Sequence, residues 1–210
     1  MVRPNVDLLP LLPVERDDET WTYRHLETGH QFAISCTQLL GRRLTPAARA
    51  AIEGYRHLWE PRGNAVHSAL EHWLLDGTEP EDGPYNDWIR PLLQHPCWDA
   101  VTIIGIEARM FDLPHDIAGT GDVLVRYADG TVGAWDLKTK NAKSSNRQDV
   151  RPQLGFATRA LVDHYDLTPS RNAVIWSYPG ETRVETVNAD ECHYAWMDAV
   201  ESYLWDCRPW

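Results

Sequence analysis

Cysteine is scarce in this sequence, and the few cysteines are not grouped. The 210 residues contain four, with no Cys-x-x-Cys pair and no histidine at zinc-finger spacing. Disulfide-stapled folds and structural zinc sites both need clustered cysteines. We therefore exclude both and expect reduced, mostly buried thiols at Cys36, Cys97, Cys192 and Cys207.

Long hydrophobic runs are also absent. No stretch approaches the roughly 20 apolar residues that a membrane helix needs. The N-terminal residues 1–13 mix leucine and proline and are interrupted by Asp7, so they lack the continuous apolar centre of a signal peptide. The sequence therefore predicts a cytoplasmic protein with no membrane partner.

Basic residues are outnumbered: 20 Lys and Arg stand against 31 Asp and Glu, a formal net charge of −11. This deficit argues against a general nucleic-acid binder, whose surface is usually basic. It is not uniform, because residues 137–159 carry a charge of +5 and the rest of the chain −16. We expect any contact with a polyanion along this basic stretch, which contains Lys138, Lys140, Lys143, Arg147, Arg151 and Arg159.

The size and composition fit one globular domain. The mass is 24.0 kDa, with 43% hydrophobic and 24% charged residues. Hydrophobic periodicity predicts an extended N-terminal arm over 1–33 and a single domain over 34–210. We expect a helical pattern over 35–44, a helix starting at Pro46 and ending at 58, a break at 62–64 and a helix 64–75. These are followed by an acidic loop 76–87 and strands 101–111, 122–127 and 131–139. The remaining expected elements are a helix beginning at 147 or 152 and ending at 164, strands 172–178 and 182–187, and a helix 189–205. This order predicts an α/β fold with a central mixed sheet flanked by helices and an N-terminal helical segment.

The side chains best suited to catalysis lie between Gly119 and Lys138. Side chains alternate along a strand, so Asp136 and Lys138 share one face while Leu137 is buried behind them. Two carboxylates in a partly dry site repel each other, and oxygen ligands select Mg²⁺ or Mn²⁺. Beside such a metal, Lys138 would orient or deprotonate a water, or neutralise a phosphate oxygen.

The turn between the two strands decides whether Asp122 joins this site. A two-residue loop at Asp129-Gly130 would place Asp122 opposite Leu137, on the wrong face. A three-residue loop, Ala128 to Gly130 with a left-handed Gly130, pairs residue numbers that sum to 258 and places Asp122 opposite Asp136. A site shared by Asp122 and Asp136 therefore requires the three-residue loop, and we predict that loop.

Five segments together resemble one known family. Gly-x-x-Asp122, a hairpin and Asp136-x-Lys138 are similar to the core of the PD-(D/E)xK nuclease superfamily. Arg62-Gly-Asn-Ala-Val-His67-Ser-Ala-Leu-Glu71 resembles the RGxxVHxxLE motif of its RecB-like exonuclease branch. The other three segments are Ser35-Cys-Thr37-Gln-Leu-Leu, Glu107 on the strand before Gly-x-x-Asp, and Gln153-Leu-Gly-Phe-Ala. The resemblance covers about residues 34 to 165.

This resemblance implies a restriction-endonuclease-like core and a set of site residues. Asp122, Asp136 and Lys138 would be catalytic, and His67, Asp122, Asp136 and the Leu137 carbonyl would bind Mg²⁺ or Mn²⁺. Glu71 and Glu107 would lie around the metal, as ligands or as partners of ligands. DNA contacts would come from Ser35, Thr37, Arg62, Lys140, Lys143, Arg147 and Gln153.

The sequence departs from the family pattern in two places. Ala157 stands where the Tyr of the family's Q-x-x-x-Y motif would be. The iron–sulfur branch needs a tight downstream group of three cysteines, whereas Cys192 and Cys207 are far apart. We expect no iron–sulfur cluster.

Together these features predict a metal-dependent DNA exonuclease acting at DNA ends or on single strands in recombination, repair or phage DNA processing. A phage-encoded protein would work in the host cytoplasm, with a recombination or replication protein as a possible partner. The alternatives are a structure-specific endonuclease on the same fold and a catalytically silent DNA-binding recombination protein. A zinc hydrolase using His67, Glu71 and His72 is disfavoured, because the two histidines are five residues apart and face different directions. Trp135 and Trp176 are expected in the core.

Overall fold

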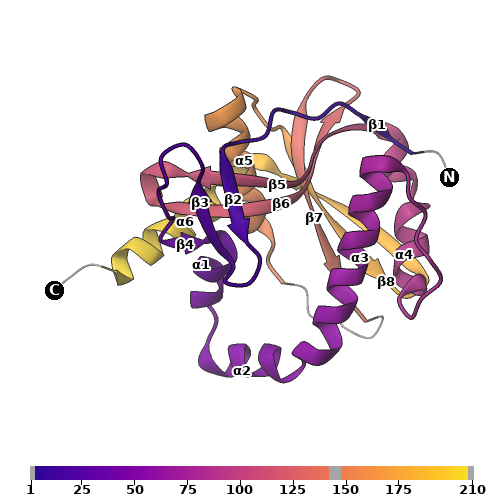
Figure 1. The fold of residues 1–210 in the computed structure, drawn as a ribbon, viewed down its shortest axis with the longest axis horizontal. Helices are drawn as coiled ribbons and strands as arrows, with labels where there is room; N and C mark the ends of the chain where they lie inside the picture. The colour runs from indigo at the N-terminus through magenta and orange to yellow at the C-terminus, as the bar shows by residue number, and fades with distance from the viewer. Residues whose placement is uncertain (1–2, 142–147, 208–210) are drawn as a thin grey trace.

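The sheet at the centre of the computed structural model is mixed and seven-stranded, and helices pack on both of its faces (Figure 1). The structure describes residues 3–141 and 148–207. The strands are β1 (Asn5–Val6), β2 (Val14–Asp17), β3 (Thr22–His25), β4 (Ile34–Ser35), β5 (Val101–Asp112), β6 (Ile117–Tyr127), β7 (Val132–Thr139), β8 (Arg171–Tyr178) and β9 (Glu181–Asn188). The helices are α1 (Cys36–Arg42), α2 (Pro46–Gly54), α3 (Arg56–Asp76), α4 (Asn86–Leu93), α5 (Arg151–Tyr165) and α6 (Ala189–Asp206), with 3₁₀ helices at Pro96–Ala100 and Leu113–His115.

The strand order is β1-β5-β6-β7-β8-β9, and the short β4 pairs with β6 beyond the end of β7. The pairs β1–β5, β4–β6 and β7–β8 are parallel, and the other pairs are antiparallel. Strands β2 and β3 form a separate hairpin. The expected α/β architecture is therefore confirmed.

Successive side chains of each strand point to opposite faces of the sheet, so the core has two layers, one on each face. Trp176 on β8 faces α5 and α6, where it joins Phe156 and Trp196. Trp135 on β7 faces α3 and α4, where it packs with Trp73 and Trp98. The expectation that Trp135 and Trp176 are core residues is confirmed, and five of the nine tryptophans within the described residues are buried.

Helices α5 and α6 approach closely at one glycine. A Cβ at Gly155 would lie 2.0 Å from the carbonyl oxygen of Cys192, so only glycine permits this helix contact. The contact fixes α5 against the sheet, and α5 carries Gln153 to the end of β7.

The N-terminal half differs from expectation in two places. The residues expected as an extended arm include β1, which joins the sheet, and a hairpin whose Tyr23 packs with Phe32 against Phe111. Helix α3 runs through the predicted break at 62–64, despite Pro61. Its buried face, together with two hydrogen bonds from Arg62 to Thr139, outweighs the cost of proline and glycine in a helix.

The acidic loop is present, and α4, which was not predicted, follows it. Among the described residues, no helix combines the length and the apolar character needed to cross a membrane.

Candidate metal centre

The turn between β6 and β7 sets the register of the site. Gly130 has φ of 84°, its N–H donates to the carbonyl of Tyr127 (2.9 Å), and Tyr127 N–H donates to Thr131 O (2.8 Å). The paired residues, from Arg126 with Val132 to Val123 with Trp135, have numbers that sum to 258. The predicted three-residue loop is confirmed.

Asp122 is held at the point where this ladder ends. Its Oδ2 accepts a hydrogen bond from the backbone N–H of Leu137 at 2.7 Å. The carboxylate thus replaces a backbone partner on β7, and only 11% of the side chain is exposed. This bond fixes Asp122 beside the Asp136–Lys138 strand and leaves Oδ1 directed toward His67, at 3.9 Å from Nδ1.

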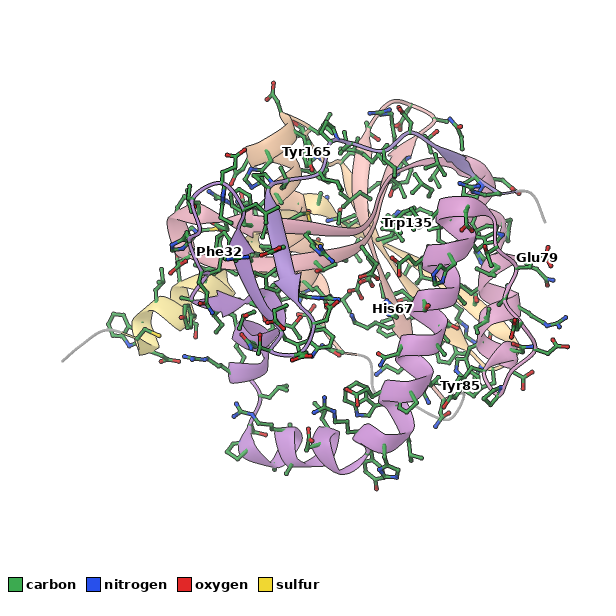
Figure 2. The ribbon with its side chains drawn as sticks, viewed as in Figure 1. Phe32, His67, Glu79, Tyr85, Trp135 and Tyr165 are labelled. Atoms are coloured by element: carbon green, nitrogen blue, oxygen red, sulfur yellow. The ribbon has the colours of Figure 1, made fainter. Side chains whose placement is uncertain are left out.

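His67 reaches the same point from α3 (Figure 2). Its Nε2–H donates to the carbonyl oxygen of Leu137 at 3.1 Å. The backbone of Leu137 is therefore bonded on both sides, by Asp122 at its nitrogen and by His67 at its oxygen. Because Nε2 is occupied in this way, Nδ1 is the nitrogen available to a metal.

Glu107 completes the group from β5. Its neighbours Ile106 and Ala108 pair with Val123 and Gly121, which places Glu107 across from Asp122. Its carboxylate Oε1 lies 3.5 Å from His67 Nδ1. The backbone of Glu107 has φ of 44°, a left-handed conformation that costs a residue with a side chain on the order of 1–2 kcal/mol. Such strain is typical of functional sites.

These three side chains fit a small divalent cation. One ligand atom each from His67, Glu107 and Asp122 lies within 4.8 Å of the other two. They line a small cavity of about 10 Å³, which is the space of about one water molecule. Two carboxylates and one imidazole suit Mn²⁺ and, with additional water ligands, Mg²⁺.

Electrostatics favour cation binding at this point. Burial lowers the pKa of His67, but the carboxylates of Asp122 and Glu107 outweigh it and raise the pKa to about 9. Without a metal, His67 is therefore protonated at neutral pH and serves as the counter-ion of the two acids. A divalent cation would replace that proton.

Asp136 and Lys138 form an ion pair beside the three metal ligands. Lys138 Nζ donates to Asp136 Oδ1 (2.8 Å) and to Gln153 Oε1 (3.0 Å). Burial raises the pKa of Asp136 to about 6, although Lys138 opposes the shift. Burial lowers the pKa of Lys138, but Asp136 and Asp122 outweigh it and raise the pKa. Lys138 thus donates hydrogen bonds to both Asp136 and Gln153 at this point.

The residues predicted to hold or surround the metal lie at or beside this centre. The Leu137 carbonyl, predicted as a metal ligand, accepts the hydrogen bond of His67 and so orients that ligand. Glu107, whose role was left open, lies among the ligand atoms, whereas Glu71 lines the cavity outside that group. Asp136 also stands outside that group and is held by Lys138.

The predicted DNA contacts divide between structural roles and accessible positions. Ser35 caps α1 by accepting from Gln38 N–H, and Arg62 is 8% exposed and bonded to Thr139. Gln153 holds Lys138, and Thr37 is exposed in the first turn of α1.

Two of the predicted DNA contacts, Lys143 and Arg147, lie outside the described residues. Lys140 is half-buried, with its ammonium 5.9 Å from the ring of Trp176. Burial lowers the pKa of Lys140, and the nearby positive charges of Lys138 and Arg62 lower it further. Three cationic side chains therefore lie near one another where β7 ends.

His72 takes no part in the centre. It is exposed, and its Nδ1 bonds to the carbonyl of Ser68 at 2.8 Å, on another face of α3. The structure therefore gives no support to a zinc site made of His67, Glu71 and His72.

Trp88 was not predicted to belong here. Its indole N–H donates to the carbonyl of Lys140 at 2.9 Å, and Arg62 lies over its ring at 5.6 Å. No local sequence signal links Trp88 to a strand end 52 residues away.

Comparisons with known proteins assign this chain to no family. No protein-family model matches the chain, and no curated protein matches it. One similar solved structure is described as "Crystal structure of SSO0001"; it is 15% identical, has a TM-score of 0.46, and the match covers 88% of this chain and 81% of that one. The class that the fold and site define is an α/β protein with a candidate His-Glu-Asp metal centre, and its activity must be argued from that centre.

Backbone strain at Glu107 can be measured directly. We expect Glu107→Gly to be more stable than Glu107→Ala by about 0.5–1 kcal/mol, because glycine adopts a positive φ without strain. Both variants lose the same carboxylate, so the comparison isolates the backbone. Urea unfolding in EDTA measures the difference in unfolding free energy between the two variants. Equal stability would show that the backbone at Glu107 is not strained.

Because His67 is protonated in the metal-free protein, we expect metal binding at Nδ1 to release the His67 proton. Mn²⁺ binding at pH 7 should release about one proton, and apparent affinity should rise with pH toward 9, roughly tenfold per unit. Calorimetry in buffers of different ionisation enthalpy counts the protons. His67→Gln should abolish this release, whereas binding to the wild type without proton release would show that Nδ1 is not a ligand.

Proposed function

We propose that this protein is a divalent-metal-dependent nuclease that hydrolyses phosphodiester bonds in DNA. Within that class we propose an exonuclease acting at DNA ends or on single strands in recombination, repair or phage DNA processing. The observation that carries the proposal is the convergence of His67, Glu107 and Asp122 beside the charged pair Asp136–Lys138.

The proposed chemistry divides between the cation and the protein. A bound Mg²⁺ or Mn²⁺ would supply charge for the phosphate oxygens and lower the pKa of a ligated water. Asp122, Glu107 and His67 Nδ1 would hold that cation, and Leu137 would keep His67 and Asp122 in place through its backbone.

Lys138 would orient the reacting groups. Asp136 and Gln153 fix its ammonium through two of its three N–H donors. The third N–H would hold the attacking water or a phosphate oxygen, where a fixed positive charge stabilises the negative charge that develops during in-line displacement.

The charge distribution supports a phosphate-backbone substrate. Lys138, Lys140 and Arg62 gather positive charge at the end of β7, whereas the chain as a whole carries −11. Such a distribution would attract a nucleic-acid backbone at the metal centre and repel it elsewhere.

Two alternatives remain open. A structure-specific endonuclease would use the same residues and would cut an intact circular single strand, which a strict exonuclease cannot enter. A catalytically silent DNA-binding protein would bind DNA without releasing nucleotides in Mn²⁺.

Lys138→Ala tests the proposed activity. We expect wild-type protein to shorten end-labelled DNA in Mg²⁺ or Mn²⁺ but not in EDTA, and Lys138→Ala to lose at least about a thousandfold in rate while still binding DNA. Product length on single-stranded, double-stranded and circular substrates measures the activity and separates the exonuclease from the endonuclease.

Lys140→Ala is the matched control, because Lys140 is a second lysine, one residue beyond the end of β7. It should weaken DNA binding without a comparable loss of the cleavage step. Because Lys138→Ala leaves Asp136 buried without its partner, thermal unfolding must show that the variant is folded, and Lys138→Gln provides a second test. Full cleavage by a folded, contaminant-free Lys138 variant would refute the mechanism.

A further inference from the structure

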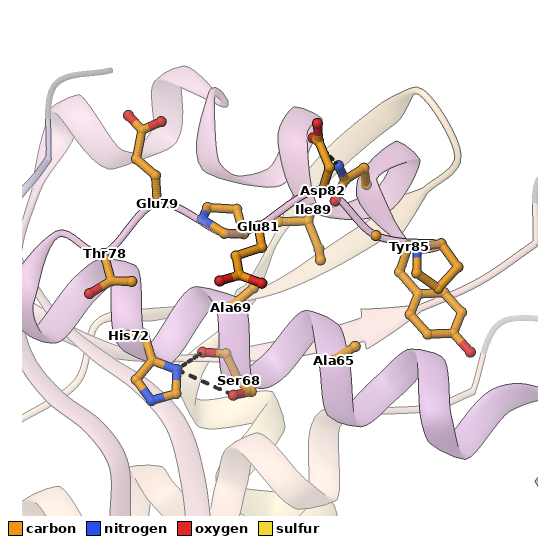
Figure 3. Close-up of a pocket in the computed structure, with 14 residues that line it drawn as sticks. Ala65, Ser68, Ala69, His72, Thr78, Glu79, Glu81, Asp82, Tyr85 and Ile89 are labelled. Atoms are coloured by element: carbon orange, nitrogen blue, oxygen red, sulfur yellow. Dashed lines mark hydrogen bonds between the residues drawn. The ribbon is translucent and has the colours of Figure 1, made fainter.

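A groove lies on the other side of α3 from His67. It has a volume of about 400 Å³ and lies between α3, the loop after it and the start of α4 (Figure 3). Small residues on α3, Ala65, Ser68 and Ala69, leave the space open, and Tyr85 and Ile89 line it from α4 and the residue before it. This volume is within the usual range for binding sites.

The loop that lines the groove is held by hydrogen bonds among its own residues. Thr78 donates from both its backbone N–H and its hydroxyl to Asp76 Oδ1 (2.8 and 2.5 Å). Asn86 donates to Asp82 Oδ1 at 2.8 Å, and Asn86 N–H donates to Gly83 O at 3.2 Å. A loop that is ordered before binding loses little entropy when a partner docks.

The rim of the groove is negatively charged. Glu79, Glu81 and Asp82 line it, whereas neither Lys nor Arg does, and His72 is the one histidine among its lining residues. Arg90 pairs with Asp82, whereas no ion pair is found for Glu79 or Glu81 within residues 3–141 and 148–207. The groove therefore combines an apolar floor with two carboxylates that have no cationic partner in the described chain.

We propose that this groove docks a segment of a partner protein that presents an arginine or lysine next to an aliphatic side chain. The aliphatic group would cover Ala65, Ala69 and Ile89, and the cationic head would pair with Glu79 or Glu81. Charge complementarity excludes a nucleic-acid occupant, because phosphates would meet carboxylates.

A protein segment fits the groove better than a small molecule does. Ser68, His72, Thr78, Glu79 and Glu81 are exposed, so a free ligand would remain largely in water. A segment that belongs to a larger surface would gain further contacts along this rim. His67 lies on another face of α3, so docking would leave the metal centre accessible, and the inference does not depend on the proposed nuclease activity.

Peptide titration followed by amide NMR tests the proposal in metal-free protein without DNA. The probe is acetyl-Gly-Arg-Leu-Arg-Gly-amide, and the control peptide replaces both arginines with glutamate. We expect shifts at Ala65, Ala69, Gly83 and Ile89 with the basic peptide alone. The double variant Glu79→Lys/Glu81→Lys should weaken binding by about tenfold or more, since the carboxylate that pairs with the peptide is lost and two cations that repel it are gained.

A control variant separates docking from attraction to an acidic protein. Glu27→Lys/Glu201→Lys makes the same change in net charge at exposed positions elsewhere and should leave the affinity unchanged. Ala69→Phe, which fills the groove, should abolish binding in a protein that remains folded. The proposal is overturned if shifts miss the groove, if both charge variants weaken binding equally, or if spermine binds the groove as tightly as the peptide.

Discussion

The hydrogen bond from Leu137 N–H to the Asp122 carboxylate holds the centre together. It forms where the β6–β7 ladder stops, and it substitutes a charged acceptor for a backbone carbonyl. Charge-assisted bonds of this kind are stronger than neutral ones. Asp122 is thereby fixed on the face of Asp136, and the carbonyl on the other side of Leu137 receives His67. One peptide segment of β7 thus positions groups from β6 and α3.

Charge balance explains how so many ionisable groups share a partly buried space. Lys138 offsets Asp136, and protonated His67 offsets one of the two charges of Asp122 and Glu107, which leaves one negative charge for a cation to offset. Buried charges are tolerated only when they are paired or bind a metal. The left-handed backbone of Glu107 adds a further cost, and strain of this kind is typical of functional sites.

Local signals made the C-terminal part of the fold predictable. The strands of β5 to β9 and helices α5 and α6 follow from periodicity and turn residues, and the need to bring Asp122 opposite Asp136 predicted the loop at Gly130. Helix α3 was predicted with a break, because Pro61 and Gly63 act locally whereas the bonds from Arg62 to Thr139 are tertiary.

The remaining features depend on contacts that sequence spacing does not show. Strand β1 has two residues and pairs with a strand almost one hundred positions away. The strand residue Glu107 was a candidate, but its left-handed conformation was not foreseen. The Leu137 carbonyl was predicted to bind the metal, and the hydrogen bond that it accepts from the α3 histidine appears only in three dimensions.

Anomalous diffraction from crystals grown with Mn²⁺ shows whether His67, Glu107 and Asp122 bind one divalent cation. We expect one strong peak at coordination distance, roughly 2.0–2.6 Å, from His67 Nδ1 and from a carboxylate oxygen of both Glu107 and Asp122. No peak at saturating Mn²⁺, or a peak bound by Asp136 without His67 and Glu107, would contradict this expectation.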